Sequence, residues 1–221
     1  TCSKKKFGRS LIFCGEHSND NQLNYKPQNK FTIPPFLIKL FMNRFFVSIF
    51  NMIYFYKSTN KEIKKDSINS FFYPLDTISN WNKFYGKNGF TQIQILIKDK
   101  KKYYSSTKKI FDFLNKYKIY SFLTTIKIYG KGNNNFLSFC EKGMTITMDV
   151  PISKSFRINY LNLEKLFLKQ NIKIYLAKDS FMSTKHFSRT YKNLNNFINN
   201  LKLYNCNSIF KSKLSDRLKI T

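Results

Sequence analysis

Acidic residues are scarce in this chain. Its 221 residues include 12 Asp and Glu against 39 Lys and Arg, which gives a formal net charge of +27 at pH 7. Such an excess of cations favours an anionic partner: a nucleic acid, an acidic membrane surface or a phosphorylated substrate. The 24 Phe and 14 Tyr accompany abundant Lys, Asn and Ile, all encoded by A+T-rich codons. Codon bias therefore explains the same charge without a functional reason, and both explanations stay open.

Glycine and proline are also few, with seven Gly and five Pro, so little of the chain resembles a low-complexity linker. Hydrophobic residues make up 42% of the sequence, which excludes an intrinsically disordered chain. The length is sufficient for one large or two small domains with an apolar core.

Cysteine and histidine are too few and too scattered for the common metal and catalytic sites. The four cysteines lie far apart with no CxxC pair, and the only histidines are His17 and His186. A zinc site is not expected, and neither histidine belongs to a Ser/His/Asp constellation. Reduced thiols in an intracellular protein are the expectation. Gly130-Lys131-Gly132 lacks the context of a phosphate-binding loop.

No uncharged apolar run spans a bilayer. The nearest candidate, Phe36–Tyr56, contains Lys39 and Arg44, and each charge costs roughly 2.5–3.5 kcal/mol near the centre of a membrane helix. Polar residues recur in it at about helical spacing, which predicts a basic amphipathic helix, either packed on the domain or lying at a lipid interface. The N-terminus lacks Met and a signal peptide and is typical of the interior of a longer product.

Hydrophobic periodicity predicts an α+β fold. Alternating patterns indicate strands at 91–97, 122–129, 143–150 and 172–177, and helical stripes indicate helices at 103–117 and 159–170. The β-α-β-β-α-β order predicts a ferredoxin-like, four-stranded antiparallel sheet with both helices on one face. Residues 1–69 are expected to be irregular apart from the amphipathic helix, 70–180 to form the sheet core, and 181–221 a helical C-terminal segment.

One face of the predicted sheet is unusually polar. If the strands align, it carries two amides, a lysine and several hydroxyls: Gln92, Gln94, Lys127, Tyr129, Thr145 and Thr147. Antiparallel sheets often have one solvated face, so a solvent-exposed surface and a polar binding floor are both open interpretations.

Motifs along the whole chain resemble one enzyme family. They are Gly8–Leu11, Gly15–His17, Pro34–Phe36, Ser70–Asp76, Trp81–Gly86, Gly89–Gln94, Lys127–Gly130, Leu137–Phe139, Gly143–Thr145, Asp149–Pro151, Tyr175–Ser180 and Arg217–Leu218. In this order and with these gaps, the chain resembles the C-terminal, substrate-side part of the decaprenylphosphoryl-β-D-ribose oxidase family, FAD-linked sugar oxidases of the vanillyl-alcohol-oxidase type.

The resemblance implies oxidation of the ribose 2′-hydroxyl of a polyprenyl-phosphate sugar, with FAD as hydride acceptor and a partner reductase completing epimerisation to arabinose for cell-wall arabinan. It also implies that FAD is bound mainly by a domain upstream of this chain. Without that domain, this chain is expected to be inactive. The expected location is the cytoplasm or the periphery of the inner membrane, and the Phe36–Tyr56 helix is a candidate for contact with the membrane that holds the substrate.

The resemblance also assigns flavin-side residues. Tyr175 matches a tyrosine that contacts FAD, and Lys178 matches a lysine beside flavin and substrate, so Lys178 is the candidate catalytic residue. A cation suits the negative charge that develops on a reduced flavin. Without the resemblance, Lys178 reads as a solvated lysine at a strand end.

The implied substrate-binding residues lie on the predicted sheet and upstream of it: Gln92, Gln94, Lys127, Tyr129, Thr145, Thr147, Trp81 and Phe72. Trp81 is expected to form an apolar wall and Lys127 to bind phosphate or sugar oxygens. Thr147 stands where mycobacterial members carry the cysteine attacked by covalent inhibitors, so no such adduct is expected. Thr145 stands where those members have Asn, and Tyr129 where Phe is common.

Two alternatives remain. An aldonolactone-type FAD sugar oxidase is disfavoured because the expected His-Trp-Gly-Lys type of segment is missing. A nucleic-acid-binding protein is supported by charge alone, and nucleic acid is not the expected partner.

Overall fold

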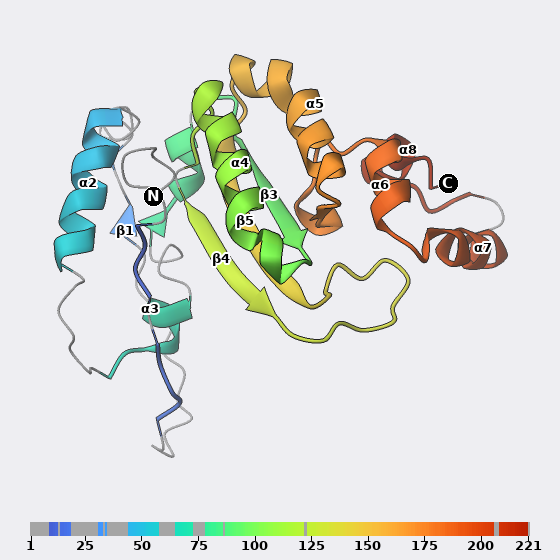
Figure 1. Ribbon diagram of the computed structural model, residues 1–221, viewed down its shortest axis with the longest axis horizontal. Coiled ribbons are helices and arrows are strands. Elements are labelled where there is room, and N and C mark those ends of the chain that lie inside the picture. The colour runs from blue at the N-terminus through green and yellow to red at the C-terminus, as the bar shows by residue number, and fades with distance from the viewer. Residues whose placement is uncertain are drawn as a thin grey trace. The chain divides into compact units, whose positions relative to one another are not determined.

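A computed structural model describes residues 9–12, 14–18, 31–32, 34, 44–57, 65–72, 78–85, 87–121, 123–205 and 208–220. The chain divides into two compact units, Gly8–Gly89 and Phe90–Thr221. Figure 1 labels the elements of both units.

The N-terminal unit contains short elements around one longer helix. A two-stranded parallel pair joins β1 (Phe31–Thr32) to β2 (Ile78–Ser79), with α3 (Ile68–Phe72) and the 3-10 helix Trp81–Tyr85 nearby in sequence. The longer helix, α2, runs over Arg44–Lys57. It confirms the C-terminal part of the predicted amphipathic helix, whose residues 36–43 lie outside the described part of the chain.

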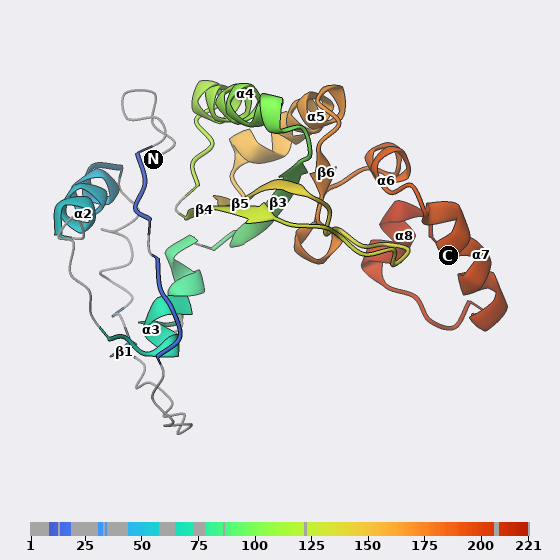
Figure 2. The same cartoon turned by 60° about the horizontal axis from the view of Figure 1, so that its bottom comes forward.

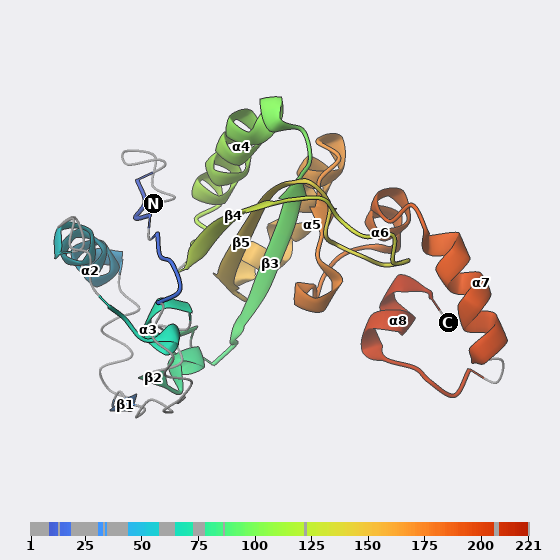
Figure 3. The same cartoon turned by 90° about the horizontal axis from the view of Figure 1, so that it is seen from below.

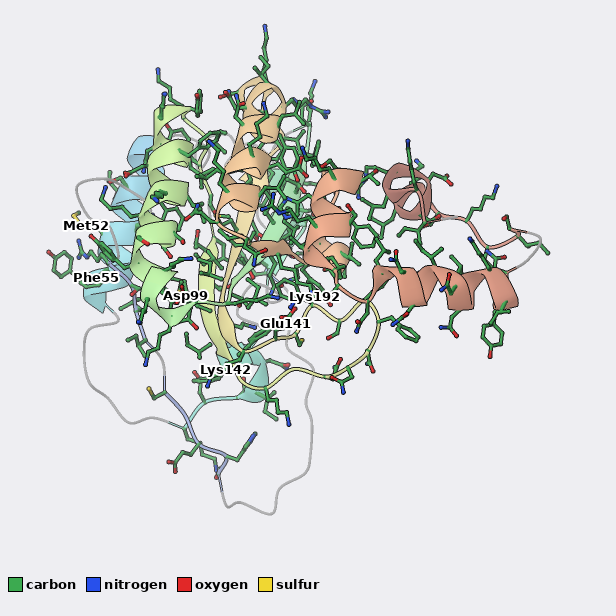
Figure 4. The ribbon with its side chains drawn as sticks, turned by 45° about the vertical axis from the view of Figure 1, so that its right-hand side comes forward. Met52, Phe55, Asp99, Glu141, Lys142 and Lys192 are labelled. Carbon is green, nitrogen blue, oxygen red and sulfur yellow. The ribbon has the colours of Figure 1, made fainter. Side chains whose placement is uncertain are left out.

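Helix α2 exposes much apolar surface. Its outward side chains include Met52 and Tyr56, and Figure 4 shows Met52 and Phe55 projecting from the helix. The guanidinium carbon of Arg9 lies 3.6 Å from the centroid of the Phe55 ring, a cation–π contact that ties the N-terminal segment to α2. Within the described ranges, no helix is long and apolar enough to cross a membrane.

The C-terminal unit is built on the predicted four-stranded antiparallel sheet. Its strands are β3 (Phe90–Ile97), β4 (Thr124–Tyr129), β5 (Gly143–Pro151) and β6 (Lys173–Ile174), arranged in the order β4-β5-β3-β6. Every pair is antiparallel. Two long helices, α4 (Tyr103–Lys116) and α5 (Lys154–Lys169), lie on one side of this sheet (Figure 2). The predicted α+β class is thus confirmed.

The apolar core fills the space between the sheet and these helices. Strands β3 and β5 contribute alternate residues, and α4 and α5 contribute the stripes that face them. The buried cluster includes Ile93, Ile95, Ile97, Ile110, Leu114, Ile146, Met148, Phe156, Leu163 and Phe167. Because these side chains occupy every second strand position, the remaining positions of β3 and β5 face the opposite side of the sheet.

Three shorter helices complete the unit: α6 (Thr184–Thr190), α7 (Leu194–Tyr204) and α8 (Lys213–Leu218). Figure 3 shows them together on the side of the C-terminal unit away from β4, and Figure 2 shows β6 on that side of the sheet. They form the helical C-terminal segment that the sequence predicts for residues 181–221.

Two predicted boundaries were wrong for local reasons. Helix α5 begins at Lys154 rather than near residue 159, because the Ser153 hydroxyl accepts a hydrogen bond from the Phe156 amide and caps the helix. The strand predicted over 172–177 pairs only at Lys173–Ile174, and Leu176–Lys178 forms a 3-10 turn instead. The Asp179 carboxylate after this turn accepts two backbone N–H bonds and fixes the new chain direction.

Candidate functional site

The sheet register brings the predicted polar residues onto one face. Gln94 of β3 is opposite Thr147 of β5, and Thr147 is in turn opposite Thr125 of the next strand, β4. Thr145 of β5 is likewise opposite Lys127 of β4. Residues opposite one another in an antiparallel pair point to the same face, and so do residues two positions apart. The polar side chains of β3, β4 and β5 on this face are Gln92, Gln94, Lys127, Tyr129, Thr145 and Thr147, joined by Thr125 and Asp149, and the apolar Leu96 lies among them. We call it the polar sheet face.

Much of the polar sheet face is covered. Gln94, Thr145 and Asp149 are 4%, 0% and 2% exposed, whereas Gln92 is half-buried and Lys127 is exposed. An ordinary solvated face would leave all of these side chains in water, so that interpretation fails over the centre of the sheet.

A hydrogen bond across the face orients one of its amides. The Gln94 side-chain nitrogen donates to the Tyr129 hydroxyl over 3.1 Å. Gln94 lies on the central strand β3 and Tyr129 on the edge strand β4, so the bond spans the width of β5 between them. The amide is therefore held in one orientation, and a ligand that uses it meets a group already ordered.

The long loop between β4 and β5, residues 130–142, supplies an aromatic cover. Phe139 is buried, with ring centroids 4.7 Å from Tyr175 and 6.3 Å from Tyr129. A Cβ added to Gly132 would lie 2.0 Å from the Cys140 carbonyl oxygen, so the two arms of the loop meet where only glycine fits. The aromatic contacts place this loop over the end of the polar sheet face near Tyr175.

A buried charge cluster pins the same loop to β6. The Lys173 ammonium donates to the Ser138 carbonyl over 2.6 Å and to a Glu141 carboxylate oxygen over 2.8 Å, while Lys98 pairs with the other oxygen. The Lys173 ammonium nitrogen also lies 4.3 Å from the centroid of the Tyr191 ring. Figure 4 shows Glu141 where the loop enters β5.

The pKa shifts in this cluster follow from burial and pairing. Burial lowers the pKa of Lys173, although Glu141 partly offsets that shift. For Glu141, burial alone would raise the pKa, but hydrogen bonds from Lys173 and Lys98 outweigh it and the pKa lies below its ordinary value. The carboxylate is thus ionised at neutral pH and holds both lysines.

Sequence reasoning missed this cluster, and it gave no site role to Phe139 or Asp149, which it noted only as parts of motifs and, for Asp149, of a strand face. One signal was available for Lys173: it lies two positions before Tyr175 between apolar neighbours, so it shares the face of Tyr175. Glu141 carries no comparable signal, because its place depends on the path of a long loop.

Thr145 has an unusual hydroxyl. Its side chain is fully buried on the polar sheet face, and its Oγ1 makes no hydrogen bond within the described residues. A buried hydroxyl without a partner costs about 1–3 kcal/mol. A buried hydroxyl without a partner is uncommon in proteins and calls for an explanation, such as a bound ligand or an ordered water.

Tyr175 and Lys178 lie at the end of the polar sheet face near β6. The Tyr175 amide donates to the Gln94 carbonyl over 2.8 Å, which anchors the start of the 3-10 turn to β3. Lys178 ends that turn and is half-buried. The next residue, Asp179, pairs with Arg217 over 2.7 Å, so the turn is fixed from both sides.

Trp81 and Phe72 belong to the N-terminal unit. Trp81 packs edge to face on Tyr85, with ring centroids 6.1 Å apart. Phe72 ends α3, and its side chain lies outside the described part of the structure. The apolar wall expected of Trp81 and the substrate contact expected of Phe72 stay predictions.

A second buried polar pair lies below the sheet edge. His186 is fully buried, its Nε2 donates to the Ile172 carbonyl over 2.9 Å, and its Nδ1 lies 3.7 Å from a Glu164 oxygen. Because a carbonyl only accepts, Nε2 carries a proton. Burial lowers the pKa of His186, although the Ile172 bond and Glu164 oppose that shift.

Within the described ranges, no three His, Cys, Asp or Glu residues lie close enough to hold a metal ion. Of the cysteines in the described ranges, Cys14 and Cys140 are free and exposed.

Comparison with known proteins identifies a similar oxidase. The relative is decaprenylphosphoryl-beta-D-ribose oxidase of Mycolicibacterium smegmatis, 27% identical over 224 aligned residues. The match covers 97% of this chain and 48% of the relative, so the chain spans about half the length of the curated relative it matches. No family model matches the chain. The resemblance predicted from the sequence motifs is confirmed.

Proposed function

We propose that this chain is the substrate side of an FAD-linked oxidase that acts on the ribose 2′-hydroxyl of a polyprenyl-phosphate sugar. The observation that carries the proposal is the polar sheet face, which gathers amide, hydroxyl and ammonium groups from three strands and includes a buried hydroxyl without a partner. Similarity over 97% of the chain to an oxidase named for decaprenylphosphoryl ribose supports the same substrate class.

The side chains of the polar sheet face match the groups of such a substrate. The amides of Gln92 and Gln94 offer both donors and acceptors to sugar hydroxyls. Lys127 is exposed on the same face and suits a phosphate as a point charge. The Thr145 hydroxyl gains on ligand binding the hydrogen bond that it lacks without one.

Residues at the β6 end of the face fit the flavin end of FAD. Tyr175 is a half-buried aromatic packed on Phe139, and Lys178 is a half-buried cation three residues later. Bound FAD supplies the hydride acceptor that alcohol oxidation needs. The cation of Lys178 stabilises negative charge at that end of the face. The match covers only 48% of the relative, which supports assigning the rest of FAD binding to the part of the protein that this chain does not match.

The chain itself orients the substrate and limits the access of water. The bond between Gln94 and Tyr129 fixes one amide, and Phe139 covers the adjoining surface. The Lys173 and Glu141 contacts hold the loop that carries Phe139, and so keep this cover in place. The product expected of the whole protein is a 2′-keto sugar, which a partner reductase would reduce to complete the epimerisation.

Two experiments test the proposal. In the first, the 221-residue chain is co-expressed with the half of the mycobacterial relative that it does not match. Co-purification of both halves with a yellow flavin, bleached anaerobically by polyprenylphosphoryl ribose, supports the proposal.

The second experiment uses the chain alone. Titration with the same ligand is expected to shift amide NMR signals of β3, β4 and β5. Lys127→Met is expected to weaken binding, whereas Lys109→Met, on exposed α4, leaves it unchanged. Shifts confined to other elements, or equal effects of the two substitutions, contradict the proposal.

A further inference from the structure

The turn that carries Lys178 leads directly into a buried carboxylate. The side chain of Asp179 is 3% exposed. One of its oxygens accepts hydrogen bonds from the Phe181 amide over 2.9 Å and from the Met182 amide over 2.8 Å. The other oxygen accepts from the Arg217 guanidinium over 2.7 Å. These three bonds lie within the chain, so they require no contact with another part of the protein.

Arg217 binds the same segment at two further points. Its other terminal nitrogen, Nη1, donates to the Met182 carbonyl, and its own backbone carbonyl accepts from the Thr184 hydroxyl over 3.2 Å. A planar guanidinium can donate to a carboxylate and to a carbonyl at once, which the single ammonium of a lysine does less well. One residue of α8 therefore holds the chain at residues 179, 182 and 184.

Helix α8 gives Arg217 a fixed support. Leu218 and Ile220 are 1% and 7% exposed and belong to the apolar core. Between them, Lys219 adopts a left-handed conformation with a φ of 54°, and the Ile220 amide donates to the Ser215 carbonyl over 3.0 Å. The backbone on both sides of the guanidinium is thus anchored, and a functional group works best on such a rigid element.

Lys178 lies between two fixed points of the chain. Upstream, the Tyr175 amide donates to the Gln94 carbonyl of β3 over 2.8 Å. Downstream, the residue next to Lys178 is Asp179, with the bonds described above. The place of the Lys178 ammonium therefore depends on both anchors, and a displacement of about 1 Å at a reacting centre can lower a rate on the order of a hundredfold.

We propose that Arg217 is a positioning residue for Lys178, a role that rests on the proposed oxidase function. Through Asp179, Arg217 fixes the end of the turn and so places the Lys178 ammonium at the flavin end of the polar sheet face. Without Arg217, the Asp179 carboxylate keeps two N–H bonds but loses the cation that compensates its buried charge. The carboxylate would then turn toward water and carry the end of the turn with it.

Anaerobic flavin reduction by polyprenylphosphoryl ribose tests the role in the assembly of this chain with the unmatched half of the relative. Arg217→Met should lower the rate at saturating substrate by about tenfold or more. The dissociation constant of the substrate should change by less than about twofold, because the polar sheet face is untouched. In Lys178→Met, the same Arg217 substitution should change the rate by less than about twofold, since there is no ammonium left to place.

Amide hydrogen exchange of the 221-residue chain gives a second readout that needs no flavin. Arg217→Met should speed the exchange of amides 178–182 by about tenfold or more and leave β3 and β5 unchanged. Arg217→Lys, which keeps the charge, should recover part of both the protection and the rate. Arg189→Met removes a guanidinium from an exposed position of α6 and should change neither readout.

The outcomes separate this role from the proposed function. A native assembly whose flavin is not reduced refutes the proposed function and, with it, the role of Arg217. If the native flavin is reduced, two results refute the role of Arg217 alone. One is an equal rate in Arg217→Met, and the other is a loss of the same factor with and without Lys178, which would indicate general destabilisation. Should Arg217→Met fail to assemble, Arg217→Lys serves for the same comparison.

Discussion

Replacing Thr145 by Val should raise stability and lower ligand affinity together. The Thr145 hydroxyl is fully buried without a hydrogen-bond partner. Removing it relieves a penalty of about 1–3 kcal/mol, and the added methyl contributes roughly 0.8 kcal/mol. Since neighbouring atoms relax, we expect the free energy of unfolding to rise by about 1–2 kcal/mol.

The matched control is the same substitution at a satisfied hydroxyl. Thr190 is also buried, but its hydroxyl donates to the His186 carbonyl over 2.8 Å. Thr190→Val should therefore lower the free energy of unfolding by about 0.5–1.5 kcal/mol. Trp81 lies in the N-terminal unit, so amide hydrogen exchange of β3 and β5 is the appropriate assay for both variants.

The functional half of this prediction needs the flavin-bound assembly. If the Thr145 hydroxyl binds substrate, Thr145→Val weakens substrate binding about tenfold there. A Thr145→Val protein destabilised as much as Thr190→Val would refute the reasoning, because its hydroxyl would then have a partner in the absence of a ligand.

Three further outcomes are expected. Lys173→Met and Glu141→Gln should each lower the free energy of unfolding by about 1–3 kcal/mol. The double variant should lose at least about 1 kcal/mol less of that free energy than the sum of the two single losses. Losses that simply add, measured by hydrogen exchange, would show that the pair is not coupled. Gly132→Ala should expose the amides of the β4–β5 loop to exchange, whereas Gly130→Ala, with open space around its Cβ, should not. The free energy of unfolding should fall as the pH drops below 6.5, and His186 alone should account for at most about 2 kcal/mol of that loss at pH 5. The reason is that the imidazole binds a proton in the unfolded chain, whereas burial disfavours that proton in the folded chain. An unchanged pH dependence of stability in His186→Gln would contradict this.

Alternation was sufficient to predict β3 and β5, because each strand carries mainly apolar residues on one face and mainly polar residues on the other, although the structure buries most of both faces. Alternation within each strand also put Gln92 with Gln94 and Thr145 with Thr147. The register between β3 and β5 brings these two pairs to the same face of the sheet.

What the sequence could not supply depends on contacts between distant segments. The cover by Phe139 and the Lys173–Glu141 pair result from the path of a long loop, which no local pattern encodes. The end of β6 depends on Asp179, whose carboxylate accepts N–H bonds from the residues after it. The burial of Thr145 likewise could not be read from its hydroxyl, which is typical of either a solvated or a covered face.

Anaerobic flavin reduction in the assembled protein tests most directly whether the polar sheet face meets flavin and substrate. Lys178 and Lys185 lie close in sequence, Lys178 in the turn after β6 and Lys185 exposed on α6. With polyprenylphosphoryl ribose, the flavin should be reduced at equal rates in the native protein and in Lys185→Met. Lys178→Met should retain bound flavin, but the flavin should be reduced at least about a hundredfold more slowly. This factor is the order of magnitude expected from the loss of one group that stabilises the developing charge. Equal rates in Lys178→Met and Lys185→Met would contradict the account.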